Sequence, residues 1–175
     1  MVNTTGVKLI GRKMWLAQPA LHPPIPLEHP VNYIVILHTA TEECHTQSEC
    51  AFVTKQIQNY HIGGHGWLDI GYSFLIGGDG NVYEGRGWDS RGAFAKSHNH
   101  LAIGIAVIGT FTVVVPSDRQ IFALNYWIEE GVRLKKISPD YKILTHRQLS
   151  DTSSPGSAFV RLIQTWPRWS STPEG

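Results

Sequence analysis

The sequence predicts an α/β domain with a mixed, mostly parallel central β-sheet flanked by helices. Short apolar runs of strand length, such as residues 33–37 and 102–108, alternate along the chain with long amphipathic segments. This alternation is typical of α/β sheets. The 175 residues suffice for one domain that buries about 70% of the surface of its unfolded chain.

The N-terminal residues 1–30 predict an extended segment packed on a domain that spans residues 31–170. Prolines recur through this segment, and proline fixes φ and removes a backbone donor. Trp15 and Leu16 are the expected points of attachment to the core.

The domain itself begins with a buried strand and an amphipathic helix. The apolar run at 33–37 predicts a strand covered on both faces. Residues 46–61 carry Cys50, Val53, Ile57 and Tyr60 at three- and four-residue spacing, which predicts a helix that ends at a glycine pair.

The rest of the chain alternates strands and helices. Residues 72–76 and 81–84 flank a glycine-rich turn and predict a hairpin, and 102–108 predicts another buried strand. Ser117 and Gln120 have the spacing of a capping box at the start of a helix that runs to about residue 136. A strand at 141–145 and a helix at 158–166 close the domain.

Charge and hydropathy exclude several classes of partner. The net charge is +1, so no bulk electrostatic attraction to nucleic acid or to an anionic membrane is expected. An acidic ligand must therefore be held by a few placed residues. No apolar run has membrane-spanning length, and residues 1–12 lack the core of a signal peptide.

The two cysteines, Cys44 and Cys50, leave two interpretations open. They are either free thiols near the start of a helix or a disulfide, which would remove roughly 2 kcal/mol of loop entropy from the unfolded chain. A disulfide favours an oxidising compartment and therefore secretion, whereas no signal peptide is visible in this sequence. The expected location is therefore secreted or cytoplasmic.

Two of the nine histidines stand where open α/β sheets place binding groups. His38 and His146 each follow a predicted buried strand at its C-terminal end. The alternative is that each one only caps its strand through backbone hydrogen bonds.

Several longer motifs resemble one family. They are Ile-Leu-His-Thr at 36–39, Gly-Trp-Leu-Asp-Ile-Gly-Tyr-Ser-Phe at 66–74, Ile-Gly-Gly-Asp-Gly at 76–80, Val-Tyr-Glu-Gly-Arg-Gly-Trp at 82–88, and His-Arg-Gln at 146–148 followed by Ser-Pro-Gly at 154–156. From about Lys8 to Trp169 the chain resembles the peptidoglycan recognition proteins, relatives of phage-type N-acetylmuramoyl-L-alanine amidases. The resemblance implies the amidase-like fold and a disulfide between Cys44 and Cys50.

The resemblance also implies that this chain is not an enzyme. Amidases of the family bind zinc through two histidines and a cysteine, and the matching positions here are Leu37, His146 and Ser154. A catalytic zinc needs about three protein ligands, and leucine offers no donor atom. His38 points to the opposite face of its strand, so it should not replace the missing ligand. Tyr72 matches a tyrosine that assists cleavage, but without a metal we expect no hydrolysis and no cofactor.

What remains is a groove for a glycan-peptide. Aromatic faces can cover sugar rings and alkyl chains, while polar groups satisfy peptide amides. The positions that match the family's groove are His38, Thr39, His61, His65, Gly66, Trp67, Tyr72, Arg86, Trp88, Asn99, Thr152, Ser153 and Ser154.

Two features predict which peptidoglycan is bound. In the family, Gly66-Trp67 accompanies stem peptides with meso-diaminopimelate, which is lysine with one more carboxylate. A guanidinium fork matches a carboxylate, and Arg86 stands where the resemblance places this arginine. The alternative is a solvated arginine between two glycines.

Three functions are therefore weighed. We expect a non-catalytic innate-immune receptor for diaminopimelate-type muropeptides, which forms a ligand-induced homo-oligomer or pairs with another receptor of the family. A zinc amidase is disfavoured by Leu37 and Ser154. An interaction module that has lost its ligand is disfavoured by the joint presence of Gly66-Trp67 and Arg86.

Overall fold

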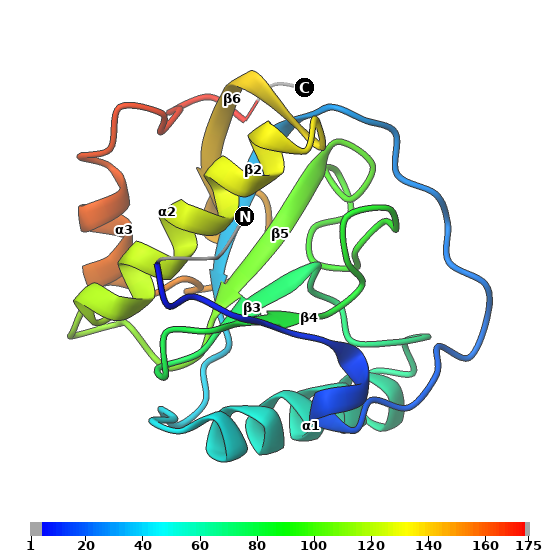
Figure 1. The fold of residues 1–175 in the computed structure, drawn as a ribbon. Coiled ribbons are helices and arrows are strands. Elements are labelled where there is room, and N and C mark those ends of the chain that lie inside the picture. The colour runs from blue at the N-terminus through cyan, green and yellow to red at the C-terminus, as the bar shows by residue number, and fades with distance from the viewer. Residues whose placement is uncertain (1–4, 174–175) are drawn as a thin grey trace.

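One sheet organises the molecule, and three α-helices cover it (Figure 1). The computed structural model describes residues 5–173. The strands are β1 (Leu9–Ile10), β2 (Val31–His38), β3 (Phe74–Ile76), β4 (Val82–Glu84), β5 (Ala102–Val107) and β6 (Ile137–Thr145). The α-helices are α1 (Gln47–Gly63), α2 (Asp118–Arg133) and α3 (Ser157–Ile163), and the 3-10 helices are η1 (Arg12–Trp15) and η2 (His146–Gln148).

The sheet is mixed and mostly parallel, as predicted. Its strand order is β1-β4-β3-β5-β2-β6, and only the β3–β4 hairpin is antiparallel. β2 lies between two parallel neighbours, with Tyr33 opposite Ala102 of β5 on one side and Lys142 of β6 on the other. The polar groups that follow β2, β5 and β6 therefore meet at one end of the sheet.

Alternate residues of the central strands face two separate cores. Ile34 and Ile36 pack on the face covered by α2 and α3, whereas Val35 and Leu37 pack on the face covered by α1. All four are at most 1% exposed. Burial on both faces explains why β2 is a continuous apolar run instead of an alternating one.

Side-chain caps set the starts of the two long helices. Thr46 accepts a hydrogen bond from the backbone of Glu49 at the start of α1. Ser117 and Gln120 form the predicted capping box at the start of α2. None of the helices within residues 5–173 combines the length and apolar character that crossing a membrane requires.

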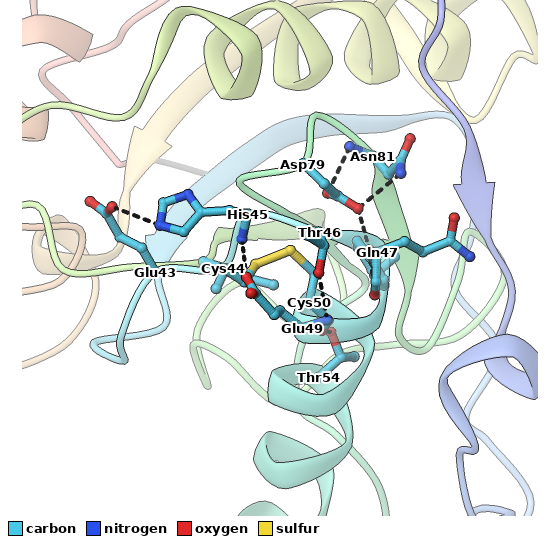
Figure 2. Close-up of a disulfide and its surroundings, with 12 residues drawn as sticks. Glu43, Cys44, His45, Thr46, Gln47, Glu49, Cys50, Thr54, Asp79 and Asn81 are labelled. Atoms are coloured by element: carbon cyan, nitrogen blue, oxygen red, sulfur yellow. Dashed lines mark hydrogen bonds and ion pairs between the residues drawn. A yellow bond between two sulfur atoms is a disulfide. The ribbon is translucent and has the colours of Figure 1, made fainter.

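Cys44 and Cys50 form the disulfide that the resemblance implied (Figure 2). Both residues are fully buried. The bond ties the chain that leaves β2 to the first turn of α1, so it restricts where α1 begins relative to β2.

The N-terminal segment contributes the edge strand β1 and a buried tryptophan. β1 pairs with β4, and the indole of Trp15 donates a hydrogen bond to the carbonyl of Glu84. Leu16 is 76% exposed, so its expected role as an attachment point is wrong. The chain reverses there in the left-handed region, with φ of 60° at Leu16, and this turns the side chain outward.

Candidate functional site

A groove of about 700 Å³ lies between α1 and the end of the sheet where β2 stops. Its walls come from the end of β2, the loop that follows it, one side of α1, and the loops before β3 and β5. We call this hollow the groove. It is lined by Leu37, Thr39, Ala40, Thr41, Glu42, Phe52, Val53, Gln56, Ile57, Tyr60, His61, His65, Trp67, Tyr72, Ala93, Phe94, His146 and Thr152.

The structure brings six of the thirteen predicted groove residues to this lining. They are Thr39, His61, His65, Trp67, Tyr72 and Thr152. The other seven lie behind the lining or elsewhere, and they are His38, Gly66, Arg86, Trp88, Asn99, Ser153 and Ser154.

One wall of the groove is a set of packed rings. The rings of His65 and Trp67 stack with centroids 4.6 Å apart, and His65 meets the edge of Tyr60 at 4.7 Å. His61 contacts Trp67 at 4.7 Å and Tyr72 at 5.2 Å. We call these five residues the aromatic wall. Mutually packed rings form a rigid surface, and such a surface suits the apolar face of a sugar or an alkyl chain.

His61 is neutral and presents an N–H group. Its Nδ1 accepts a hydrogen bond of 2.8 Å from the backbone of Gly71, so the ring hydrogen is on Nε2. Burial, then the charges of His65 and Arg86, lower the pKa of His61 from 6.5 to about 4. Within residues 5–173 no protein group accepts a hydrogen bond from Nε2. Burial raises the pKa of Tyr72 in the same wall, which keeps its phenol protonated.

At the end of β2, neighbouring residues face different sides of the sheet. Leu37 lines the groove together with His146. His38 is 5% exposed and its Nδ1 accepts a hydrogen bond from the backbone of Phe111 on the other face, so it lies outside the lining of the groove. The physical reason is the two-residue period of the strand. Burial lowers the pKa of His146, and its buried Nδ1 has no hydrogen-bond partner within the described chain.

The residues before Pro155 support the groove from behind. Ser154 is 5% exposed, and its hydroxyl accepts a hydrogen bond of 3.1 Å from the backbone of His38. Thr152 reaches the lining and also accepts a bond from the backbone of Ser154. Ser153 is exposed outside the lining, where its carbonyl accepts from Arg147.

Trp88 and Asn99, two of the predicted site residues, lie outside the lining of the groove. Trp88 packs against Phe74 at 4.6 Å and Trp127 at 5.3 Å, which places it on the face of the sheet covered by α2. Asn99 accepts hydrogen bonds from the backbones of Phe94 and Ala95, so it shapes the loop behind the wall.

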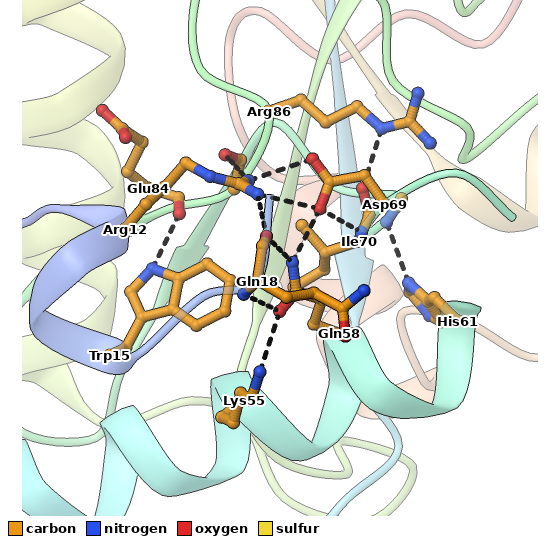
Figure 3. A network of polar contacts seen from close by, with 12 residues as sticks. Arg12, Trp15, Gln18, Lys55, Gln58, His61, Asp69, Ile70, Glu84 and Arg86 are labelled. Atoms are coloured by element: carbon orange, nitrogen blue, oxygen red, sulfur yellow. Dashed lines mark hydrogen bonds and ion pairs between the residues drawn. The ribbon is translucent and has the colours of Figure 1, made fainter. Parts of the chain in front are cut away.

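Arg86 lies beside the groove and lines a second hollow of about 260 Å³ with Arg12 and Asp69. Its Nε donates to the carbonyl of Ile70 at 2.8 Å and its Nη1 to that of Arg91 at 3.1 Å (Figure 3). Its Nη2 has no hydrogen-bond partner among residues 5–173. Its charge contributes, after burial and the charge of His65, to the lowered pKa of His61.

Gly66 precedes the aromatic wall in the chain. It has a φ of 69°, a conformation that glycine adopts without strain, and it is exposed. It therefore sets the path of the backbone into Trp67.

Sequence reasoning missed the lining that α1 supplies. Phe52 and Tyr60 are 64% and 61% exposed, which is unusual for large apolar side chains on a helix. Tyr60 was expected on the apolar face with Ile57. Two aromatic residues eight positions apart lie about 80° from each other around a helix, within one broad stripe, and this was a usable signal.

Comparisons with known proteins identify the family to which the chain is similar. The family model for N-acetylmuramoyl-L-alanine amidase matches residues 27–157. Peptidoglycan-recognition protein LE of Drosophila melanogaster is 41% identical over 161 residues, which are 92% of this chain and 47% of that protein. The chain thus spans about half the length of that relative.

Two solved structures are similar over nearly the whole fold. Peptidoglycan recognition protein LE in complex with tracheal cytotoxin, a monomeric diaminopimelic acid-type peptidoglycan, gives a TM-score of 0.91 at 41% identity and covers 93% of this chain and 95% of that one. The ectodomain complex of recognition proteins LCa and LCx bound to the same toxin gives 0.92 at 44%, with 94% and 99% covered. The chain belongs to the peptidoglycan-recognition protein family, within the larger N-acetylmuramoyl-L-alanine amidase family.

Proposed function

We propose that this chain is a non-catalytic receptor domain that binds diaminopimelate-type peptidoglycan fragments in the groove. The observation that carries the proposal is the identity of three residues, at the end of β2, at the start of η2 and directly before Pro155. Leu37 and His146 line the groove, and Ser154 lies against the backbone of His38. By the resemblance to family amidases, these are the positions that match their three zinc ligands.

This donor set does not fit a catalytic zinc. Leu37 has no lone pair, and the neutral hydroxyl of Ser154 is a poor ligand beside a thiolate. Only the imidazole of His146 remains. Among residues 5–173 no group of three or more histidine, cysteine or acidic side chains could hold a metal ion.

The groove offers what a muropeptide needs for binding. The aromatic wall provides ring faces for the sugar and for the alkyl part of the stem. The Nε2–H of His61 is a fixed donor for a carbonyl or carboxylate oxygen. Thr39 and Thr152 add hydroxyl groups to the lining.

The free Nη2 group of Arg86 supports a preference for diaminopimelate. Two of its guanidinium nitrogens are fixed by backbone carbonyls, so the third is already oriented when the ligand arrives. The extra carboxylate of diaminopimelate can pair with it, whereas a lysine-type stem has no such group. Peptidoglycan recognition protein LE is similar to this chain and was solved with a ligand of the diaminopimelic acid type.

Signalling is proposed at the level of the whole protein. The complex of LCa and LCx with tracheal cytotoxin supports a mechanism in which ligand brings two receptor domains together. By the same logic, a muropeptide in the groove of this chain would complete a surface for a second domain, either a copy of this chain or another receptor of the family, and would trigger an immune response.

A titration of ¹⁵N-labelled protein with a monomeric diaminopimelate-type muropeptide tests the proposal. We expect chemical-shift changes at Thr39, His61, Trp67 and Thr152, and no stem peptide released from the fragment. No shift changes at millimolar ligand would favour an interaction module that has lost its ligand. Release of free stem peptide would favour an amidase.

A further inference from the structure

The carboxylate of Asp69 is buried between Arg86 and His61 and lies outside the lining of the groove (Figure 3). Asp69 is 6% exposed, in the loop between α1 and β3. Its Oδ1 accepts from Arg12 Nη2 at 3.1 Å, from Gln58 Nε2 at 3.0 Å and from its neighbour Ile70 N at 2.8 Å. Its Oδ2 forms an ion pair with Arg12 Nη1 at 3.0 Å. Figure 3 shows the carboxylate enclosed by groups from η1, α1 and its own loop.

This arrangement fixes the position of Arg86 in two ways. Asp69 holds the backbone of Ile70, whose carbonyl accepts the Nε–H of Arg86. Arg12, which is paired with Asp69, also donates to the carbonyl of Gly85, the residue before Arg86. The loop that holds the guanidinium and the backbone that carries it are therefore joined through one ion pair.

The same loop fixes the tautomer of His61. The next residue after Ile70 is Gly71, and its N–H is the donor to His61 Nδ1. Gly71 is also held on its other side, where its carbonyl accepts from the backbone of Ala93. A loop that shifts at Asp69 would move the Gly71 donor, and the ring hydrogen of His61 could then move to Nδ1.

We propose that Asp69 is a positioning residue for ligand specificity, which acts through Arg12 and the 69–71 loop to orient the guanidinium of Arg86 and the Nε2–H of His61. The proposal rests on the proposed function. It assigns a role in recognition to the N-terminal segment, because Arg12 comes from η1. It also explains why the ion pair is buried beside the groove and away from its lining.

Replacement of Asp69 by asparagine removes the negative charge and keeps the size of the side chain. An asparagine keeps one acceptor oxygen, but its NH₂ group would face Arg12 Nη1, a donor against a donor at about 3 Å. We therefore expect Asp69→Asn to release Arg12 and loosen the loop without removing volume.

Asp79→Asn is the matched control. Asp79 is a partly buried aspartate whose carboxylate accepts hydrogen bonds from Asn81 and Tyr83 near the disulfide. It has no contact with Arg86 or His61. A general loss of stability would affect both variants, whereas loss of positioning would affect only Asp69→Asn.

The readout is the ratio of affinities for diaminopimelate-type and lysine-type monomeric muropeptides, measured by calorimetry. We expect Asp69→Asn to reduce this ratio by roughly threefold or more, because neighbouring groups in one network couple by such amounts. Asp79→Asn should leave the ratio unchanged. In the background of Arg86→Ala the effect of Asp69→Asn on the ratio should disappear. An unchanged ratio in Asp69→Asn, an equal drop in both aspartate variants, or an undiminished effect without Arg86 would each overturn the proposal.

A second measurement separates this proposal from the proposed function. The ¹⁵N shifts of the His61 ring report its tautomer without any ligand, and we expect Nε2–H in the parent and a shifted pattern in Asp69→Asn. Absence of muropeptide binding by the parent would refute the proposed function. An unchanged His61 pattern in Asp69→Asn would refute the positioning role, whether or not the parent binds. If Asp69→Asn does not fold, Arg12→Gln removes the same ion pair from its more exposed side, at 24% exposure, and the same outcomes apply.

Discussion

Replacement of Arg86 by alanine should lower the affinity for diaminopimelate-type muropeptides and leave the affinity for lysine-type muropeptides nearly unchanged. The change removes the bonds to the carbonyls of Ile70 and Arg91 and the free Nη2 group. Arg86 itself lines a hollow of about 260 Å³, so water can enter the space that its side chain leaves and replace the lost donors. We therefore expect a folded variant with a groove of unchanged lining.

The expected loss follows from a single charge-assisted hydrogen bond. Such a bond contributes about 1.5–3 kcal/mol, which corresponds to roughly a ten- to 150-fold loss of affinity for the diaminopimelate fragment. The upper part of this range is favoured by the geometry, because two backbone carbonyls orient the guanidinium before binding. A lysine-type fragment lacks the extra carboxylate, so its affinity should change little.

Calorimetry with both fragments and a matched arginine control checks this prediction. Arg91→Ala removes the same charge and a hydrogen bond to Pro26, but it keeps the backbone carbonyl that holds Arg86. Its affinity for diaminopimelate should stay within about twofold of the parent, since exposed charges contribute little at ordinary salt. Equal affinity of Arg86→Ala and the parent for the diaminopimelate fragment would refute the reasoning, as would an equal loss for both fragments.

Three further predictions concern metal, pH and the disulfide. The double variant Leu37→His with Ser154→Cys should bind zinc at equilibrium dialysis, and failure to bind under conditions where family amidases do would make the ligand assignment wrong. Because the folded pKa of His61 is about 4, below its ordinary 6.5, stability should be fully present above about pH 6.5 and fall by up to about 3 kcal/mol towards pH 4 in urea titrations. His61→Gln should make that dependence shallower, with the remainder due to His38, whose pKa burial also lowers to about 4, and an unchanged slope would contradict the assignment. Reduction of the Cys44–Cys50 bond should lower the free energy of unfolding by roughly 2 kcal/mol, and a variant with both cysteines replaced by alanine should show no response to reductant.

Most of the fold was predictable because its signals are local. The apolar run of β2, the glycine-rich turn of the hairpin and the capping box at Ser117 each depend on a few consecutive residues. The edge strand β1 was missed because two residues carry no period. The early start of β6 at Ile137 was missed because Ser138, Pro139 and Asp140 interrupt its apolar pattern.

The groove was only partly predictable, because side-chain direction is decided by distant contacts. His38 was assigned to the groove by its place in a motif, although the two-residue period of the strand already turns it away from Leu37. Trp88 stands between Gly87 and Asp89 in a loop, where no period indicates a face. The contacts of Asp69 join residues up to 57 positions apart, and no spacing in the sequence indicates such a pair.

Incubation of the purified, zinc-supplemented protein with diaminopimelate-type peptidoglycan tests the central claim most directly. The measurement combines the metal content of the protein with mass spectrometry of the soluble products. A groove with leucine and serine at two of three ligand positions predicts protein bound to the polymer, substoichiometric zinc and no free stem peptide. One zinc per chain together with released stem peptide would contradict the account.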